Sequence, residues 1–125
     1  MSVPKNLLYT NNHEWVKFIT DDTAIIGLTD YAQESLGEII FINLCMEGEI
    51  FEVGELIGDV ESITEISDIL CPLGGIVQKV NSKALEKPEL INEDPYNTWL
   101  VEIGKITDKS ALISSGEYEE FINSW

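Results

Sequence analysis

Short apolar segments separated by turn residues run along most of the chain, and this pattern predicts strands rather than long helices. The segments "HEWVKFI" (13–19) and "TAIIGL" (23–28) flank Asp21 and Asp22, which predicts a β-hairpin. Further strands are expected at "EIIFINL", "ELIGDVES", "EISDIL", "GIVQKVN" and "TWLVEIG". With glycine and proline between them, these segments favour a mainly β fold.

Two helical patterns lie in the middle of the chain. Asp30 and Gln33 have the spacing of a capping pair, and Gly37 is a suitable C-terminal stop, so a short helix is predicted over 30–36. Pro88 suits the first turn of "PELIN", where we expect one helical turn.

A third helical pattern lies at the end of the chain. Ser114 and Glu117 form a capping-box pattern, which predicts a helix near 115–124. Its apolar face, which should dock on a sheet, carries Tyr118, Phe121, Ile122 and Trp125. The expected architecture is a small barrel or sandwich with peripheral helices.

The length of 125 residues is in the range of a single domain, here residues 1–125, and 44% hydrophobic residues are enough for one core. No apolar run approaches the ~20 residues that span a bilayer. The N-terminal "MSVPKNLLYT" has neither the basic start nor the long apolar stretch of a signal peptide. We therefore expect a cytoplasmic protein with no membrane association.

The net charge of −16 disfavours nucleic-acid binding, because such a chain repels phosphate and has no arginine. All seven basic residues are lysines, and positions 18–78 carry thirteen acidic residues and no basic one. This half of the protein should present a negative surface, which favours basic protein partners. Plain solubility is the alternative explanation of the charge.

Few residues are candidates for catalysis or metal binding. Cys45 and Cys71 have neither the spacing of a zinc site nor a secretory context, and nearby acids should raise their thiol pKa. His13 is the sole histidine, so multi-histidine metal sites are excluded, and a structural hydrogen bond near Trp15 is expected. The chain is therefore predicted to be neither an enzyme nor a metalloprotein.

Several motifs in order resemble one family across nearly the whole chain. They are "YTNNHEWV", "IGLTDYAQESLGEIIFINL", "VES" followed by "SDIL", and "KPELINEDPY" before a tryptophan. Together they resemble the H-protein of the glycine cleavage system. The resemblance implies a barrel-sandwich hybrid, the lipoyl-domain fold. It also implies a non-enzymatic carrier whose lipoyl arm visits glycine decarboxylase, aminomethyltransferase and lipoamide dehydrogenase.

The position of the family's lipoyl lysine departs from the pattern. The family attaches the arm to the lysine of a Glu-Ser-Val-Lys-Ala hairpin, and alignment on Glu61 places Thr64 there. A threonine hydroxyl is a poor nucleophile without a base, and its side chain is short and stiff. No lysine lies between Lys17 and Lys79, and Lys79 falls in a predicted strand beyond the hairpin. We therefore expect no lipoate and no other cofactor.

Two functions remain open. The first is a monomeric, lipoate-free binding module, either an adaptor or repurposed. By resemblance it docks on aminomethyltransferase, glycine decarboxylase, lipoamide dehydrogenase or lipoate ligase. An acidic docking surface would then comprise Glu14, Glu61, Glu65 and Asp68, although the same residues fit a solvated charge run. The second is a working carrier in glycine catabolism with an atypical attachment residue.

Overall fold

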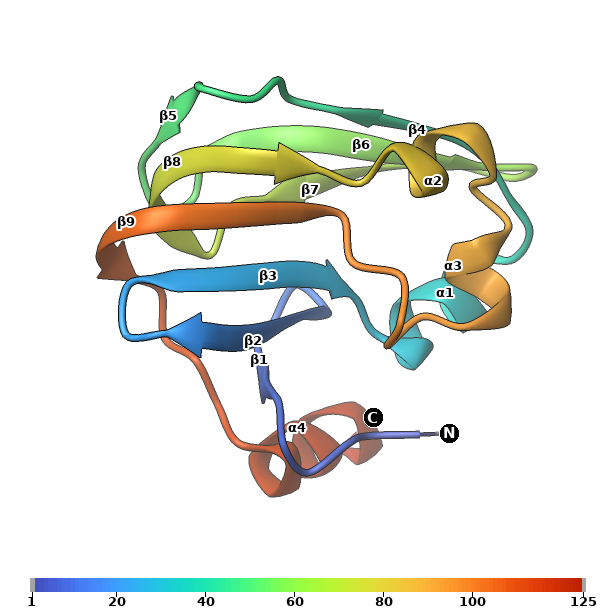
Figure 1. Ribbon diagram of the computed structural model, residues 1–125. Helices are drawn as coiled ribbons and strands as arrows, with labels where there is room; N and C mark the ends of the chain where they lie inside the picture. Colours follow the sequence, from blue (N-terminus) through green and yellow to red (C-terminus); the bar gives the residue numbers. More distant parts are fainter. Residues whose placement is uncertain (1, 125) are drawn as a thin grey trace.

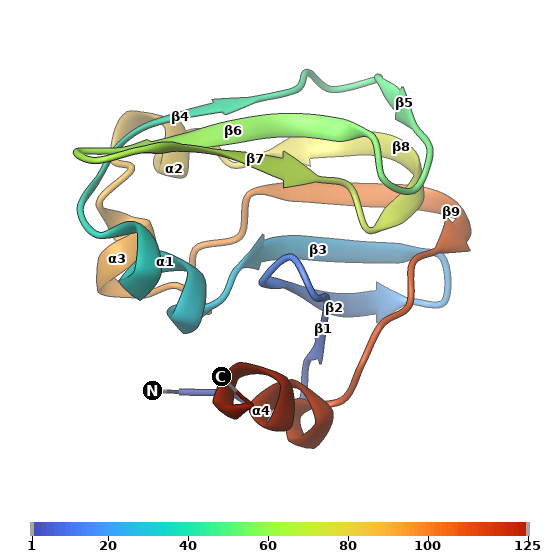
Figure 2. The same ribbon diagram turned by 180° about the vertical axis from the view of Figure 1, so that it is seen from behind.

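A computed structural model describes residues 2–124, which form two β-sheets with short helices at their edges (Figures 1 and 2). The strands are β1 (Leu8–Tyr9), β2 (Glu14–Thr20), β3 (Thr23–Leu28), β4 (Ile39–Leu44), β5 (Ile50–Phe51), β6 (Leu56–Ser62), β7 (Ile66–Leu70), β8 (Leu73–Val80) and β9 (Val101–Lys109). The helices are α1 (Asp30–Leu36), α2 (Ser82–Glu86), α3 (Leu90–Glu93) and α4 (Ser115–Asn123). Among the described residues, no helix has the length and apolar character that crossing a membrane requires.

The sheets differ in size and connectivity. One has six strands in the order β1-β2-β3-β9-β8-β5, and the other has three in the order β4-β6-β7. All the pairings between these strands are antiparallel. In Figure 1 the three-stranded sheet lies above β2 and β3, with β6 and β7 overlapping β8 in the view, while α4 and the N and C labels lie at the bottom. The mainly β, barrel-sandwich prediction is confirmed.

The main core comes from residues of both sheets that alternate with exposed ones. Its buried side chains include Val16, Ile26, Ile42, Val60, Ile69, Leu73 and Ile103. Because successive strand residues point to opposite sides, burying these positions exposes their neighbours. That alternation decides which side chains of the three-stranded sheet meet solvent.

A second core, which we name the aromatic cluster, consists of Leu7, Tyr9, Trp15 and Tyr118. The rings of Tyr9 and Tyr118 stack with centroids 4.7 Å apart, which fixes α4 against β1. The indole of Trp15 donates a hydrogen bond to the Pro95 carbonyl at 3.1 Å. This cluster ties the chain ends to the six-stranded sheet.

Helix α1 has the predicted bounds but a different N-cap. The cap is Thr29, whose hydroxyl accepts a hydrogen bond from the Ala32 N–H. Asp30 is instead the first helical residue and accepts a bond from the Gln33 side-chain amide at 2.8 Å. Gly37 ends the helix with φ of 81°, as its lack of a Cβ atom allows.

The other helices confirm two predictions and add one element. Helix α4 begins with the predicted capping box, and Tyr118 is fully buried; Trp125 lies outside the described residues. The predicted turn after Pro88 is α3. Helix α2 was not predicted, because its signal is one short cap, the Asn81 side chain accepting from the N–H of the second helical residue.

Candidate functional site

The position of interest is the tip of the β6–β7 hairpin. Glu61 pairs with Ile66, and the N–H of Ser62 donates to the Glu65 carbonyl at 2.8 Å, which leaves Ile63 and Thr64 as a two-residue loop. In Figure 1 the tip projects past the ends of the other strands, toward the helical end of the molecule.

The buried side chain of Ser62 organises this loop. Its hydroxyl accepts hydrogen bonds from the N–H groups of Thr64 and Glu65, both at 3.2 Å. The N–H of Ile63 donates to the Glu38 carbonyl at 3.1 Å, which ties the tip to the start of β4. The loop is therefore held by the Ser62 hydroxyl, as hydroxyl side chains commonly hold turns, and by one bond to the residue before β4.

The chemistry at the tip does not fit a covalent acyl arm. The Thr64 hydroxyl shares a hydrogen bond with the Ser62 hydroxyl at 3.3 Å, and the exposed loop offers no amine. A serine hydroxyl as sole side-chain partner does not supply the base that threonine needs to become nucleophilic. The residues present thus do not fit the lipoyl group that the resemblance implies.

Lys79 lies in the other sheet. It is an exposed residue of β8 and pairs with Glu102 of β9, just before α2. The prediction that Lys79 belongs to a strand beyond the hairpin is confirmed. A lysine within a paired strand does not project from the fold as the loop residues of a hairpin tip do.

Three of the four acidic residues that we expected on the surface lie around the hairpin. Glu65 and Asp68 are exposed and Glu61 is half-buried. Glu65 and Asp68 also line a cavity of about 130 Å³ between α1 and β7, whose floor includes Leu28, Leu36 and Ile69. The hairpin therefore has an acidic rim beside a small, partly apolar cavity.

Glu14 was expected on the same acidic surface, but it is buried, with 1% of the residue exposed. One carboxylate oxygen accepts from the Thr10 hydroxyl at 3.0 Å, and the other accepts from the N–H of Leu70 at 3.1 Å. Burial raises the pKa of Glu14 to about 7, and these hydrogen bonds oppose the shift. The preceding residue, His13, has a φ of 64°, a left-handed conformation that the sequence pattern did not resolve.

Beside Glu14 is a second, smaller cavity of about 60 Å³. Its lining includes Thr10, Glu14, Cys71 and Ser110. Among the described residues, the Ser110 hydroxyl is the one buried side-chain polar atom without a hydrogen-bond partner. Because Glu14 is almost fully buried, its carboxylate faces the interior of the fold and is not available to a docking protein.

His13 has a structural role, although its partner differs from the one expected. Its Nδ1 atom forms a 2.7 Å hydrogen bond with the Tyr118 hydroxyl, not with a group near Trp15. The imidazole also stacks on Tyr31, with ring centroids 4.5 Å apart. Burial lowers the pKa of His13, so the neutral ring is favoured in this contact.

Neither cysteine has the properties of a nucleophile. Burial raises the thiol pKa of Cys45 and of Cys71 to about 11, and nearby acids, Glu49 for Cys45, add to the effect. The Cys71 thiol donates to the Leu73 carbonyl at 2.9 Å. Both thiols therefore stay protonated at neutral pH, as the sequence predicted.

Comparisons with known proteins agree on one family. A sequence model of the family described as "Glycine cleavage H-protein" matches residues 7–125. The glycine cleavage system H protein of Lachnoclostridium phytofermentans is 48% identical over 122 residues, covering 98% of this chain and 96% of that protein. The one from Herpetosiphon aurantiacus is 45% identical over 123 residues, covering 98% and 95%.

A solved structure agrees as well. The glycine cleavage system H protein of Mycobacterium marinum superposes with a TM-score of 0.91 at 32% identity, covering 98% of this chain and 100% of that one. Fold, sequence family and relatives thus coincide over almost the full chain. The chain belongs to the glycine cleavage H-protein family.

Proposed function

We propose that this protein is a lipoate-free member of the H-protein family that acts as a binding module, not as a covalent carrier. The observation that carries the proposal is the tip of the β6–β7 hairpin. There Thr64 stands at the position that the motif assigns to the lipoyl lysine, hydrogen-bonded to Ser62. Amide attachment of an acyl group needs an amine, and the chain has no lysine between Lys17 and Lys79.

Family membership limits the functions that the module can have. H-proteins carry groups between enzymes and are not catalysts, so the chain is not an enzyme. The partners that fit the proposal are the enzymes that meet H-proteins: aminomethyltransferase, glycine decarboxylase, lipoamide dehydrogenase or the lipoate ligase. We place this role in the cytoplasm, with the protein as a monomer. The acidic rim of Glu61, Glu65 and Asp68 supports electrostatically steered encounters with a partner.

The test is an attempt to attach lipoate. The full chain is incubated with lipoate ligase, ATP and lipoate, and its intact mass is measured beside that of the matched variant Thr64→Lys. We expect the natural chain to stay unmodified and the variant to gain one lipoyl group, because the hairpin frame around position 64 is retained. A lipoyl group on the natural chain would contradict the proposal.

One alternative is a working carrier with an unusual attachment residue, and the whole-chain similarity to H proteins favours it. Glycine decarboxylation with this chain as the sole H component distinguishes the two functions. Turnover that Thr64→Ala abolishes would support the atypical carrier. Turnover that appears only in Thr64→Lys supports the lipoate-free module.

A further inference from the structure

The outer side of the three-stranded sheet presents apolar side chains to solvent. The strand register aligns Phe41 of β4, Glu61 of β6 and Ile66 of β7 in one row, so their side chains point to the same side. Phe41 is 50% exposed and Ile66 is 65% exposed. Ile63, at the tip, is 64% exposed and extends this apolar region past the row.

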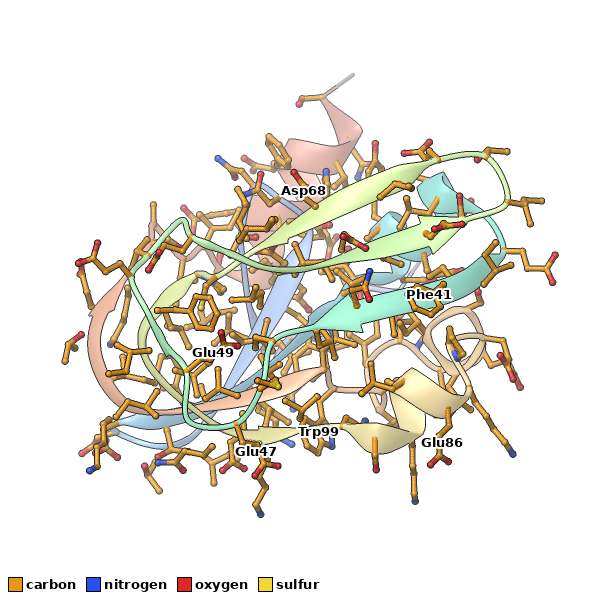
Figure 3. All side chains as sticks on the ribbon, turned by 90° about the horizontal axis from the view of Figure 1, so that it is seen from above. Phe41, Glu47, Glu49, Asp68, Glu86 and Trp99 are labelled. Carbon is orange, nitrogen blue, oxygen red and sulfur yellow. The ribbon has the colours of Figure 1, made fainter. Side chains whose placement is uncertain are left out.

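The neighbouring row on the same side is polar and acidic. It consists of Asn43, Asp59 and Asp68, also aligned by the register. The Asn43 side-chain amide donates to the Asp59 carboxylate at 3.2 Å, which keeps both groups at the surface. Figure 3 looks onto this side of the sheet, with Phe41 over β4 and Asp68 over the opposite edge strand.

We name this surface the hairpin face and define it by Phe41, Asp59, Glu61, Ile63, Ile66 and Asp68. It combines exposed apolar side chains with carboxylates on β4, β6, β7 and the hairpin tip. The carboxylates of Asp59 and Glu61 lie on the central strand β6, with Phe41 and Ile66 on the strands at either side. Clustered exposed apolar side chains on a small protein mark interaction sites.

We propose that the hairpin face docks on a protein surface that carries arginine or lysine beside exposed apolar side chains. This inference deepens the proposed function and rests on it, since it gives the binding module its surface and the chemistry of its partner. Apolar side chains of the partner would contact Phe41 and Ile66, and its basic groups would pair with Glu61, Asp59 and Asp68.

The charge of the chain selects this partner over two others. Positions 18–78, which include the whole hairpin face, contain thirteen acidic residues and no basic one. A second copy would bring two such faces together, and like charges opposed at close range are unfavourable. An anionic membrane surface is repelled for the same reason. A basic protein surface is attracted, and its approach is accelerated.

The experiment uses three synthetic peptides of equal length and the full-length ¹⁵N-labelled chain. One peptide alternates arginine and leucine, the second has serine in place of leucine, and the third has glutamate in place of arginine. Titrations are followed by NMR at physiological ionic strength. We expect the arginine–leucine peptide to bind most tightly and to shift the amides of β4, β6 and β7.

Variants then test the residues. Phe41→Ser and Ile66→Ser should each weaken binding of the arginine–leucine peptide by about tenfold, as loss of a large apolar contact does. Glu61→Gln should weaken it by about threefold and reduce its salt dependence. The matched control is Ile19→Ser, because Ile19 is 55% exposed but lies on β2 of the other sheet. This control should leave binding unchanged.

Three outcomes would overturn the inference. Equal binding of the arginine–serine peptide would mean that charge alone attracts the ligand. Amide shifts centred on the six-stranded sheet would place binding elsewhere. A dimer seen by sedimentation and lost in Phe41→Ser would make a second copy the occupant. Lipoylation of the natural chain, detected by intact mass, would overturn the proposed function, and these titrations could still be interpreted. The two failures are therefore distinguishable.

Discussion

The aromatic cluster and the hairpin face both contain large apolar side chains, but those of the cluster are buried and those of the hairpin face are exposed. In the cluster, Tyr9 of β1 and Tyr118 of α4 are fully buried and stacked on each other. On the hairpin face, Phe41 and Ile66 are half or more exposed, although they lie on paired strands. The first region stabilises the fold, and the second leaves apolar surface free for contact with another protein.

Hydrogen bonding shows the same division. The Tyr118 hydroxyl bonds to His13 at 2.7 Å and to Thr29 at 2.8 Å, and so joins three distant segments. The bonds around Thr64 are local, within the hairpin loop itself. Changes in the cluster should therefore affect stability, whereas changes on the hairpin face should affect binding.

Gly27→Ala should destabilise the protein by about 3 kcal/mol, at the upper end of what overpacking costs. The indole of Trp15 lies directly over Gly27, so an added Cβ atom would overlap its ring. Urea unfolding measures the loss. The matched control is Gly116→Ala in α4, where nothing lies near the added atom and helix propensity favours alanine by about 0.5–1 kcal/mol. A loss below 1 kcal/mol for Gly27→Ala would contradict the tight packing.

Glu14→Gln should change how stability depends on pH. The pKa of Glu14 is raised from 4.5 to about 7 in the folded protein, so the folded state binds the proton more tightly than the unfolded chain. The stability from that proton is fully present below pH 4.5 and is lost as pH rises through 7. The loss is on the order of 3 kcal/mol. The glutamine variant should lack this component.

Unfolding curves of both proteins between pH 4.5 and 8 check this expectation. The relevant quantity is the difference between natural chain and variant, because the other carboxylates titrate in both. A difference that stays constant over this pH range would mean that the Glu14 carboxylate is ionised and well solvated, contrary to its burial.

Tyr118→Phe should lower the free energy of unfolding by about 1–2 kcal/mol, because the Thr29 hydroxyl and His13 Nδ1 both lose a partner. The ring, and with it the stacking on Tyr9, is retained. Thermal unfolding measures the effect. Tyr31→Phe is the control, since the His13 stacking needs only the ring. Equal losses in both variants would show that the Tyr118 hydroxyl bonds contribute no specific stability.

Ile66→Thr should change stability by no more than about 0.5 kcal/mol, because the side chain is 65% exposed on the outer side of β7. The matched substitution on the same strand is Ile69→Thr, where the residue is 1% exposed and the cost should exceed about 2 kcal/mol. Denaturant midpoints of the two variants test whether Ile66 lies on the exposed side of β7 and Ile69 on the buried side. Similar losses would mean that the hairpin face is structural.

The sequence predicted what local patterns encode. The hairpin of β2 and β3, helix α1 and the capping box of α4 follow from short-range spacing, and their bounds are confirmed to within a residue or two. The family motifs located the hairpin and Thr64 at its tip. These features depend on residues close together in the chain.

The features that the sequence missed depend on pairing between strands. The run "EIIFINL" has four consecutive apolar residues, at positions 39–42, so its pattern did not show that Ile42 is buried and Phe41 exposed. The register with β6 and a bulge in β4 decide this, and neither is visible locally. Glu14 was misassigned for a related reason, because its partner, the N–H of Leu70, lies 56 positions away.

The absence of lipoate is tested most directly by the intact mass of the protein purified from its native cells, followed by peptide mapping of residues 56–80. We expect the mass of the unmodified chain, with no group attached to Thr64 or Lys79. A lipoyl group on either residue would contradict it.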